Sequence, residues 1–364
     1  MARLEEICDI LDSRRIPITA SDRKPGPYPY YGANGIQDYV SDYIFDDELV
    51  LLAEDGGNFG SKEKPIAYRV SGKCWVNNHA HVLKPKDMLD VDYLCYSLMF
   101  YDVSGLVNGA TRQKLTQADM RKMEIPLRSM SEQKRITAVI NKVSDLISLR
   151  KQQLAKLDEL VKARFVELFG ATSADKCSKQ IKDYAEVLGG YAFKSDMFCT
   201  NAVPVIRISN INNGCVDPDY DVCYDELFWE QNKRFRAEQN DILMAMSGAT
   251  TGKAGLYKED MPALINQRVA CIRAKDGIAY PTFLFVATQL EWMYDLIQET
   301  SAGCAQPNIS GKQIENMPVP DATYEQQQQF AAFVEQTDKS KLAIQQSLDK
   351  LETLKRSLMQ KYFG

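Results

Sequence analysis

Few residue patterns in this 364-residue chain could support catalysis. Its two histidines, His79 and His81, would point to one face of a strand, but no HExxH motif or Cys/His group accompanies them. The segment GATTGKA (248–254) has three residues between its glycines and an alanine after its lysine, whereas a phosphate-binding P-loop needs four residues and then Ser or Thr. A GxSxG nucleophile elbow and convincing nuclease or amino-methyltransferase signatures are also missing. We therefore expect a non-catalytic protein that holds no metal ion and no cofactor of its own.

Hydrogen bonding to nucleic acid is a better represented kind of chemistry. Arg, Lys, Asn and Gln are the side chains that contact base edges and phosphates in DNA. They gather, with tyrosines and threonines, where loops are expected. The candidates in the first half of the chain are Tyr28, Tyr30, Tyr31, Asn34, Asn77, Asn78, His79, Thr111, Arg112, Gln113 and Lys114. Those in the second half are Lys194, Arg207, Asn210, Asn212, Thr250, Thr251, Lys253, Asn266, Gln267, Arg268, Gln306 and Asn308. For any single residue, a plain turn or strand role is the alternative interpretation.

An internal repeat relates the two halves of the chain. Residues 109–170 align with 303–364 at a constant offset of 194, without a gap. Matching pairs include Met123/Met317, Gln133/Gln327, Gln152/Gln346, Leu160/Leu354 and Phe169/Phe363. Upstream, VNNHAHVL (76–83) resembles INQRVACI (265–272), and EDGGNFG (54–60) takes the place of MSGATTGKAG (246–255). The chain is therefore two copies of one unit, and the equivalence of the loops at 108–114 and 302–308 favours a binding role for both.

Each copy ends in a stretch with the pattern of a long helix. From Ser131 to Leu168 the apolar residues are mostly three and four apart, and neither Pro nor Gly occurs before Gly170. Ser131 is expected to cap this helix. The second helix is expected from about Tyr324 to Phe363. Two such helices most simply pack on each other, antiparallel if a pseudo-two-fold axis relates the copies. Ordinary core helices are the alternative, but they do not explain the duplication.

The segments before the helices are typical of compact α+β domains. Short β-type runs such as 75–83 and 263–272 mix with helical stretches at 91–101 and 281–299. We predict a first globular domain at 1–130, a long helix at 131–170, a second globular domain at 171–321 and a second long helix at 322–364. The expected fold class is α+β, with two similar globular domains joined and separated by two long antiparallel helices.

Bulk composition restricts the location and the mode of DNA contact. The sequence contains no run of about 18 apolar residues, so no membrane span is predicted. The charged N-terminus lacks the apolar core of a signal peptide, and the cytoplasm is therefore the expected location. The nine cysteines form no CxxC pair, which is typical of reduced core residues. The net charge of -5 disfavours extensive phosphate contacts. Residues 131–170 carry 8 basic and 5 acidic side chains but residues 171–321 carry 14 and 20, so any DNA-binding face must be a local patch.

Two non-identical globular halves, each followed by a nearly repeated helix, resemble the specificity (S) subunits of type I restriction-modification systems over essentially the whole chain. Three phrases are similar to those of target-recognition domains in that family. They are LVNGATRQKLTQADMRKMEIPLRSMSEQKRI (106–136), DILMAMSGATTGKAGLY (241–257) and SAGCAQPNISGKQIENMPVP (301–320).

This resemblance implies that each half recognises one part of a split, asymmetric double-stranded DNA target. It implies that the helices fix the gap between the parts and dock two methyltransferase (M) subunits, which bind S-adenosylmethionine and methylate adenine. Restriction (R) subunits, with ATP and Mg²⁺, would join to give cleavage. One alternative is the specificity subunit of a type II-like methyltransferase-nuclease. Another is a coiled-coil scaffold that binds proteins rather than DNA.

Overall fold

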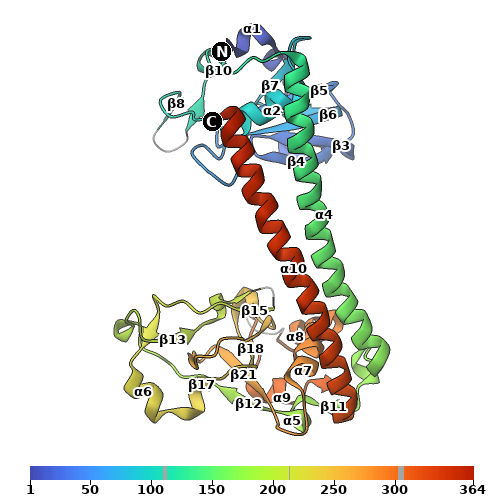
Figure 1. Ribbon diagram of the computed structural model, residues 1–364, viewed down its shortest axis with the longest axis vertical. Coiled ribbons are helices and arrows are strands. Elements are labelled where there is room, and N and C mark those ends of the chain that lie inside the picture. Colours follow the sequence, from blue (N-terminus) through green and yellow to red (C-terminus); the bar gives the residue numbers. More distant parts are fainter. Residues whose placement is uncertain (110–112, 213, 302–306) are drawn as a thin grey trace. The chain divides into compact units, whose positions relative to one another are not determined.

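Two compact units make up the structure. The computed structural model describes residues 1–109, 113–212, 214–301 and 307–364 (Figure 1). Unit 1 comprises Met1–Arg150 together with Ser347–Gly364, and unit 2 comprises Lys151–Gln346. Both divisions fall inside the long helices α4 (Met130–Phe169) and α10 (Tyr324–Phe363), so each unit contains one part of each helix. Among the described helices, none is long and apolar enough to cross a membrane.

A six-stranded sheet with the order β2-β7-β5-β6-β3-β4 is the centre of unit 1. All its neighbouring pairs are antiparallel except β3 and β6, which are parallel. Its strands are β2 (Cys8–Ile10), β3 (Pro25–Gly32), β4 (Gly35–Val40), β5 (Phe45–Ala53), β6 (Ala67–Val76) and β7 (Ala80–Pro85). Smaller elements are α1 (Leu4–Ile7), α2 (Val91–Met99), α3 (Gln117–Arg121), and the strand pairs β1 (Ala2–Arg3) with β10 (Glu124–Ile125) and β8 (Val107–Asn108) with β9 (Lys114–Leu115). Strand β5 lies between β7 and β6, and it is buried from Leu49 to Ala53 because its two faces pack into two separate hydrophobic clusters.

Unit 2 has a six-stranded sheet, β12-β21-β18-β19-β15-β14, and a four-stranded sheet, β16-β13-β20-β17. The first contains β12 (Ala185–Gly189), β14 (Ile211–Asn212), β15 (Cys215–Val216), β18 (Ile242–Ala245), β19 (Ala254–Leu256) and β21 (Val269–Ala274). The second contains β13 (Val203–Ile206), β16 (Cys223–Tyr224), β17 (Arg236–Ala237) and β20 (Ala263–Ile265). The remaining elements are β11 (Lys179–Gln180) paired with β22 (Pro318–Val319), and the helices α5 (Ile181–Tyr184), α6 (Glu226–Gln231), α7 (Pro281–Thr288), α8 (Glu291–Ser301) and α9 (Gly311–Glu315).

The strand registers confirm the internal repeat. In unit 1, Leu83 on β7 lies opposite Ile10 and Val50. In unit 2, Ile272 on β21 lies opposite Val187 and Ile242 in the same way. The short bridge between Asp55 and Lys114 in unit 1 has its equivalent between Ser247 and Asn308 in unit 2. The two units are therefore two versions of one α+β fold, as the sequence predicted.

A fully buried glutamine fastens a long helix in each unit. The Gln133 Oε1 atom accepts a hydrogen bond from the Asp90 backbone N–H at 2.8 Å, and its Nε2 donates to the carbonyl oxygens of Met88 and Arg128 at 3.0 and 2.8 Å. Gln327 makes the equivalent contacts in unit 2. Its Oε1 accepts from the Tyr280 N–H at 2.9 Å, and its Nε2 donates to the Ile278 and Ala322 carbonyls at 3.2 and 3.0 Å. Each glutamine thus joins the start of a long helix to the loop before α2 or α7.

The two long helices are antiparallel neighbours within unit 2. Along α4 the Asp158 carboxylate forms an ion pair with Lys341 on α10 at 2.6 Å, and further along, the Phe165 ring lies 5.3 Å from that of Phe330. Within unit 1, Ile136 and Ile140 of α4 share a core with the end of α10, where the Phe363 ring lies 5.0 Å from Tyr93.

The cap of α4 differs from the prediction. The Ser129 hydroxyl, rather than that of Ser131, accepts from the Glu132 N–H at 3.4 Å, while the Glu132 carboxylate accepts from the Ser129 N–H. This reciprocal pattern is the capping box, and it needs the acidic residue three positions after the cap, which Glu132 supplies for Ser129 alone.

Candidate nucleic-acid interface

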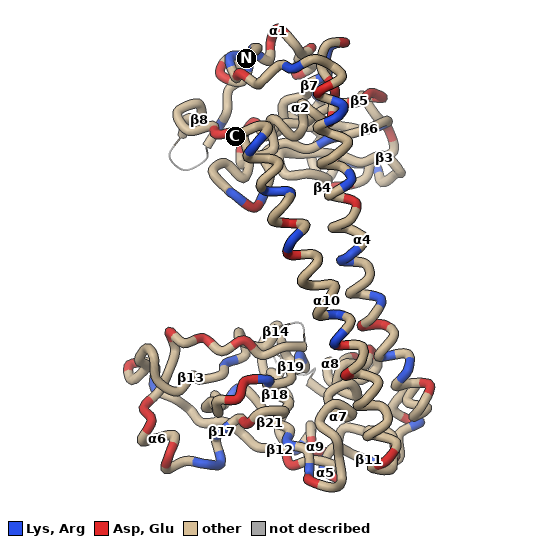
Figure 2. Tube along the Cα trace, in the orientation of Figure 1, with Lys and Arg blue, Asp and Glu red and all other residues tan. Residues whose placement is uncertain are grey.

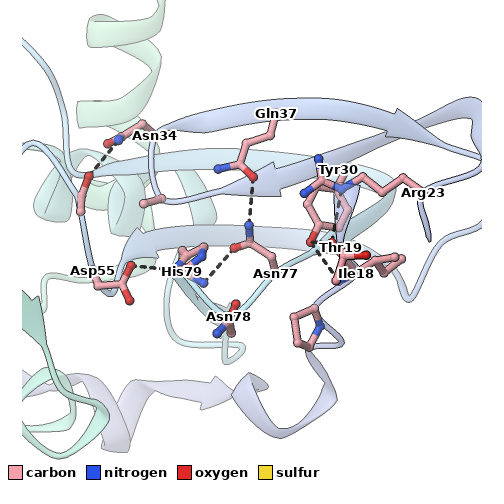
Figure 3. Close-up of a pocket in the computed structure, with 13 residues that line it drawn as sticks. Ile18, Thr19, Arg23, Tyr30, Asn34, Gln37, Asp55, Asn77, Asn78 and His79 are labelled. Carbon is pink, nitrogen blue, oxygen red and sulfur yellow. Dashed lines mark hydrogen bonds and ion pairs between the residues drawn. The ribbon is translucent and has the colours of Figure 1, made fainter. Parts of the chain in front are cut away.

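A polar cavity in unit 1 brings together five of the residues predicted to bind DNA. It has a volume of about 430 Å³ and lies between β3, β4 and the turn that joins β6 to β7 (Figure 3). The predicted residues that line it are Tyr30, Asn34, Asn77, Asn78 and His79. Its other polar side chains are Thr19, Arg23, Gln37 and Asp55, which the sequence did not single out. Amide, hydroxyl, imidazole and guanidinium groups in one concave surface supply donors and acceptors of the kind that recognise base edges.

The turn between β6 and β7 presents three of these residues. The sequence predicted one β-type run over 75–83, but the structure ends β6 at Val76 and begins β7 at Ala80. The chain turns because the Asn77 Oδ1 atom accepts from the His79 backbone N–H at 2.8 Å, which is an Asx turn. The Asn77 Nδ2 then donates to the Gln37 Oε1 at 3.1 Å. Buried Asn77 holds the turn, and exposed Asn78 is its accessible member.

The opposite wall of the cavity carries a positive charge. The Arg23 guanidinium lies 4.2 Å from the centre of the Tyr30 ring, and its Nη1 atom lies 3.4 Å from an Asp38 carboxylate oxygen. The Tyr30 side chain is 1% exposed, and its hydroxyl hydrogen-bonds to the Ile18 backbone at 3.3 Å. Tyr30 is therefore positioned to support Arg23 through a cation–π contact rather than to present its own ring.

Another part of the cavity rim comes from the segment after β5. The Asp55 carboxylate accepts a hydrogen bond from the His79 Nδ1 atom across 2.7 Å, and the Asn34 Nδ2 atom donates to the Gly56 carbonyl at 3.0 Å. Strand β9 runs alongside this segment, because Asp55 bridges to Lys114 and the Gly56 N–H donates to the Gln113 carbonyl. Gln113 and Lys114 are both exposed here. Thr111 and Arg112, predicted in the same loop, lie outside the described residues.

Tyr28 and Tyr31 do not line the cavity. The Tyr28 ring packs edge-on against Tyr43 at 5.1 Å, with the Lys73 ammonium near both rings. Tyr31 packs against Tyr68 at 5.7 Å. These two contacts place Tyr28 and Tyr31 among the side chains that hold β3 in the sheet.

Unit 2 repeats the same local geometry with other side chains. The run 263–272 was predicted to be continuous, but a turn over 266–268 separates β20 from β21. Asn266 forms it in the way Asn77 does, because its Oδ1 accepts from the Arg268 N–H at 3.2 Å. Gln267 and Arg268 are exposed on this turn.

The segment after β18 makes backbone hydrogen bonds both with that turn and with Pro307. The Met246 N–H donates to the Arg268 carbonyl at 2.8 Å, and the Gly248 N–H donates to the Pro307 carbonyl at 3.1 Å. The Thr251 side chain is buried, and its hydroxyl lies 2.7 and 3.1 Å from the Gly248 and Pro307 carbonyls, which share its one proton. Lys253 and Asn308 are exposed, and Thr250 is half-buried. Gln306 lies outside the described residues.

The other predicted residues of unit 2 have structural contacts. Arg207 pairs with Asp219 at 3.1 Å, and buried Asn210 caps the Arg207 N–H at 2.8 Å and donates to the Asp217 carbonyl. Exposed Asn212 donates to the Ser209 carbonyl, and Lys194 is exposed beside the aromatic pair of Tyr191 and Phe193. The backbone at Ile206 accepts from the Asn266 N–H, which places Arg207 next to the 266–268 turn.

Comparisons with known proteins give one consistent result. The sequence matches the family described as "Type I restriction modification DNA specificity domain" over residues 1–159 and 175–356. It is 29% identical to a putative type I restriction enzyme specificity subunit of Haemophilus influenzae, over 78% of this chain and 74% of that protein. It is 22% identical to the type I restriction enzyme MjaVIII specificity subunit of Methanocaldococcus jannaschii, over 99% of this chain and 90% of that protein.

The fold is similar to that of solved structures. The crystal structure of a type I restriction-modification S subunit from M. genitalium matches with a TM-score of 0.59 at 15% identity, covering 100% of this chain and 95% of that chain. A chain from a structure of a type I R-M system matches with a TM-score of 0.55, also at 15% identity, covering 100% and 96%.

Proposed function

Because the chain belongs to the family of type I restriction-modification DNA specificity domains, we propose that its two units recognise the two parts of a split and asymmetric DNA target. In this proposal unit 1 recognises one part through the cavity and the exposed residues Gln113 and Lys114, and unit 2 recognises the other part through the 266–268 turn and the segment at 307–308. The chain itself performs no catalysis and acts in the cytoplasm.

One observation supports this proposal most strongly: equivalent positions in the two units carry exposed polar residues of different kinds. Both units have an Asx turn, at 77–79 and at 266–268. Both also have an isolated β-bridge, between Asp55 and Lys114 in unit 1 and between Ser247 and Asn308 in unit 2. The exposed residues on the two turns are Asn78 in unit 1 and Gln267 with Arg268 in unit 2. The same scaffold with different hydrogen-bonding groups is expected to contact different bases, which makes the target asymmetric.

The partners follow from the same proposal. Two methyltransferase subunits dock on the chain and supply S-adenosylmethionine chemistry, and restriction subunits add ATP- and Mg²⁺-dependent cleavage. This chain binds none of these cofactors itself. The net charge of -5 leaves few cations for phosphates, so the methyltransferase subunits supply additional phosphate contacts and the complex binds more tightly than the isolated chain.

Methylation mapping with variants of each unit tests the proposal. The chain is co-expressed with its methyltransferase subunit, and methylated adenines are located across the host genome. We expect a split motif with a fixed gap. Asn78→Ala should relax only the part recognised by unit 1, and Gln267→Ala only the other part, because loss of a base contact costs about 1–3 kcal/mol of discrimination.

The control is Gln152→Ala, an exposed glutamine on α4 outside both interfaces, which should leave the motif unchanged. A complex that assembles with its methyltransferase but produces no new methylation would contradict the proposal. So would DNA binding that is insensitive to salt, since phosphate contacts release counterions.

A further inference from the structure

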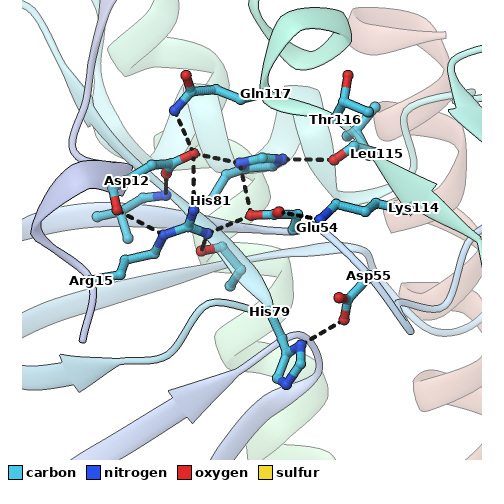
Figure 4. Close-up of polar contacts among 12 residues, drawn as sticks. Asp12, Arg15, Glu54, Asp55, His79, His81, Lys114, Leu115, Thr116 and Gln117 are labelled. Carbon is cyan, nitrogen blue, oxygen red and sulfur yellow. Dashed lines mark hydrogen bonds and ion pairs between the residues drawn. The ribbon is translucent and has the colours of Figure 1, made fainter. Parts of the chain in front are cut away.

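A cluster of five ionisable side chains contacts strand β9 in unit 1 (Figure 4). Asp12, Glu54 and His81 are buried, and their ligand atoms lie within 4.8 Å of one another. Arg15 and Lys114 complete the cluster. The Arg15 Nη1 atom lies 2.6 Å from one Glu54 oxygen, and the Lys114 Nζ lies 3.0 Å from the other. The two cations neutralise Glu54 within the protein, so the cluster is an ionic network rather than a set of free metal ligands.

Both ring nitrogens of His81 face hydrogen-bond partners inside unit 1. The Nε2 atom faces the Leu115 carbonyl oxygen at 2.9 Å, and the Nδ1 atom faces the Asp12 Oδ2 at 2.6 Å. A carbonyl oxygen only accepts. The Asp12 carboxylate also acts as an acceptor, because the Val82 N–H donates to its Oδ1 and the Gln117 Nε2 donates to its Oδ2. The His81 ring is therefore held between the Asp12 carboxylate and the Leu115 carbonyl, with a partner at each nitrogen.

The two carboxylates are held in the ionised form that this arrangement needs. Burial acts to raise the pKa of Asp12, but the hydrogen bond and charge of His81, with the Val82 and Gln117 bonds, lower it below its usual value. Burial likewise opposes ionisation of Glu54, and hydrogen bonds from Arg15 and Lys114 with the charge of His81 lower its pKa. Carboxylates with lowered pKa values stabilise the folded state above their unfolded pKa, and this contribution is lost as the pH falls through the folded values.

The network connects distant parts of unit 1 to the segment from Lys114 to Gln117. His81 on β7 contacts the Leu115 carbonyl. Glu54, which follows β5, pairs with the Lys114 side chain, and its backbone carbonyl accepts from the Leu115 N–H at 2.7 Å. Gln117 is tied to Asp12.

Unit 2 has no equivalent of this network among its described residues. Ala270 pairs with Met244 where His81 pairs with Leu52, so Ala270 takes the place of His81. The registers likewise put Met246 at the place of Glu54, and Gly189 at the place of Asp12. The repeat has therefore retained the fold but replaced all three buried ionisable groups with residues that carry no charge.

We propose that His81, buried between the Asp12 carboxylate and the Leu115 carbonyl, is a positioning residue that fixes Gln113–Leu115 for DNA recognition by unit 1 alone. This inference rests on the proposed function. It predicts that one part of the split target depends on the ionic network and that the other part does not.

Binding of the assembled complex to half-altered targets tests this inference. Duplexes that carry the mapped motif, with one or the other part replaced, give a discrimination ratio for each part. His81→Gln and Asp12→Asn should each lower the ratio for the part recognised by unit 1 about tenfold, because each breaks a buried charge pair, and should leave the other ratio unchanged. Acidification should selectively weaken the same ratio in the unaltered complex, since Asp12 and Glu54 must stay ionised.

The matched control is Asp241→Asn in unit 2, which also removes a buried carboxylate, one that Arg273 contacts at 2.7 Å. It should leave the ratio for unit 1 unchanged. If His81→Gln lowers only thermal stability and both ratios match those of the unaltered complex, the positioning role is wrong. If the unaltered complex has no split target, the proposed function fails first, and the recognition role of His81 fails with it.

A direct measurement avoids dependence on variant folding. The chain has only two histidines, so nitrogen NMR of the imidazole rings gives two signals, and His79→Gln assigns the one that remains to His81. We expect the nitrogen shifts of His81 to show a hydrogen bond at both Nδ1 and Nε2. Signals typical of a ring without hydrogen-bond partners would overturn the network.

Discussion

Gln133 and Gln327 are single side chains that each satisfy three backbone groups in a buried place. Replacement by leucine keeps the approximate volume but removes a hydrogen bond from one N–H and two carbonyls, of which the Ala322 carbonyl keeps a longer contact with the Tyr184 hydroxyl at 3.4 Å. We expect Gln133→Leu and Gln327→Leu each to lower the free energy of unfolding of its own unit by about 2–4 kcal/mol, because buried unsatisfied polar groups cost about 1–3 kcal/mol each. Urea unfolding, with amide exchange at Asp90 and Tyr280 as local probes, measures this.

Gln152 and Gln346 provide the controls for that experiment, since they are also a repeat-related glutamine pair on α4 and α10 but are exposed. Their replacement by alanine should change stability by less than about 0.5 kcal/mol. Equal small effects for the buried and the exposed pairs would mean that the three hydrogen bonds contribute little to either unit.

Asn77 and Asn266 were singled out because polar residues interrupt apolar runs there. The turns that they form were not predicted, since both runs were expected to be continuous strands. Arg23, Gln37 and the partners of His81 were missed, because their neighbours come from distant parts of the chain. Asp12 and His81 are 69 positions apart and meet only through the pairing of β2 with β7. No spacing in the sequence signals such a pair.

At the scale of elements, the long helices carry exposed leucines at repeat-related positions. Leu160 on α4 is 48% exposed, and its counterpart Leu354 on α10 is 45% exposed. Figure 2 shows acidic and basic residues along both helices. We propose that each leucine is part of the docking site of one methyltransferase subunit, because equivalent apolar positions in two copies suit two copies of the same partner.

Charge at these positions tests the docking proposal. Leu160→Glu and Leu354→Glu should each reduce the number of bound methyltransferase subunits from two to one, and the double variant should bind none, because burying an unpaired carboxylate in an interface is costly. Native mass spectrometry counts the subunits. Gln152→Glu and Gln346→Glu are the controls and should bind both. Two subunits on the double variant would show that docking occurs elsewhere.

Elements differed in how far their sequence specified them. The long helices were predictable because an uninterrupted apolar periodicity runs through each of them. The expected helix at 281–299 is instead two, α7 and α8, separated at Gln289 and Leu290. No Pro or Gly marks this break. The Gln289 side chain donates to the Ala254 carbonyl, so a tertiary contact with β19 accompanies the end of α7.

At the scale of the whole molecule, the proposed function makes the gap in the DNA target depend on helix length. The unit boundaries fall after Arg150 in α4 and after Gln346 in α10, so insertions there leave the contacts inside each unit intact. Inserting one heptad at both places preserves the apolar stripe and adds about 10 Å to each helix at about 1.5 Å per residue. At about 3.4 Å per base pair, the gap between the two recognised parts should widen by about three base pairs.

Methylation mapping of this double insertion measures the gap directly, while the sequences of the two recognised parts should stay the same because neither unit is altered. A heptad inserted into α4 alone is the control, since it changes the length of only one helix and should abolish methylation or stability. An unchanged gap in an active double-insertion complex would separate gap length from helix length. The helices would then serve to join the units, and the methyltransferase subunits would have to set the distance between the two contacts with DNA.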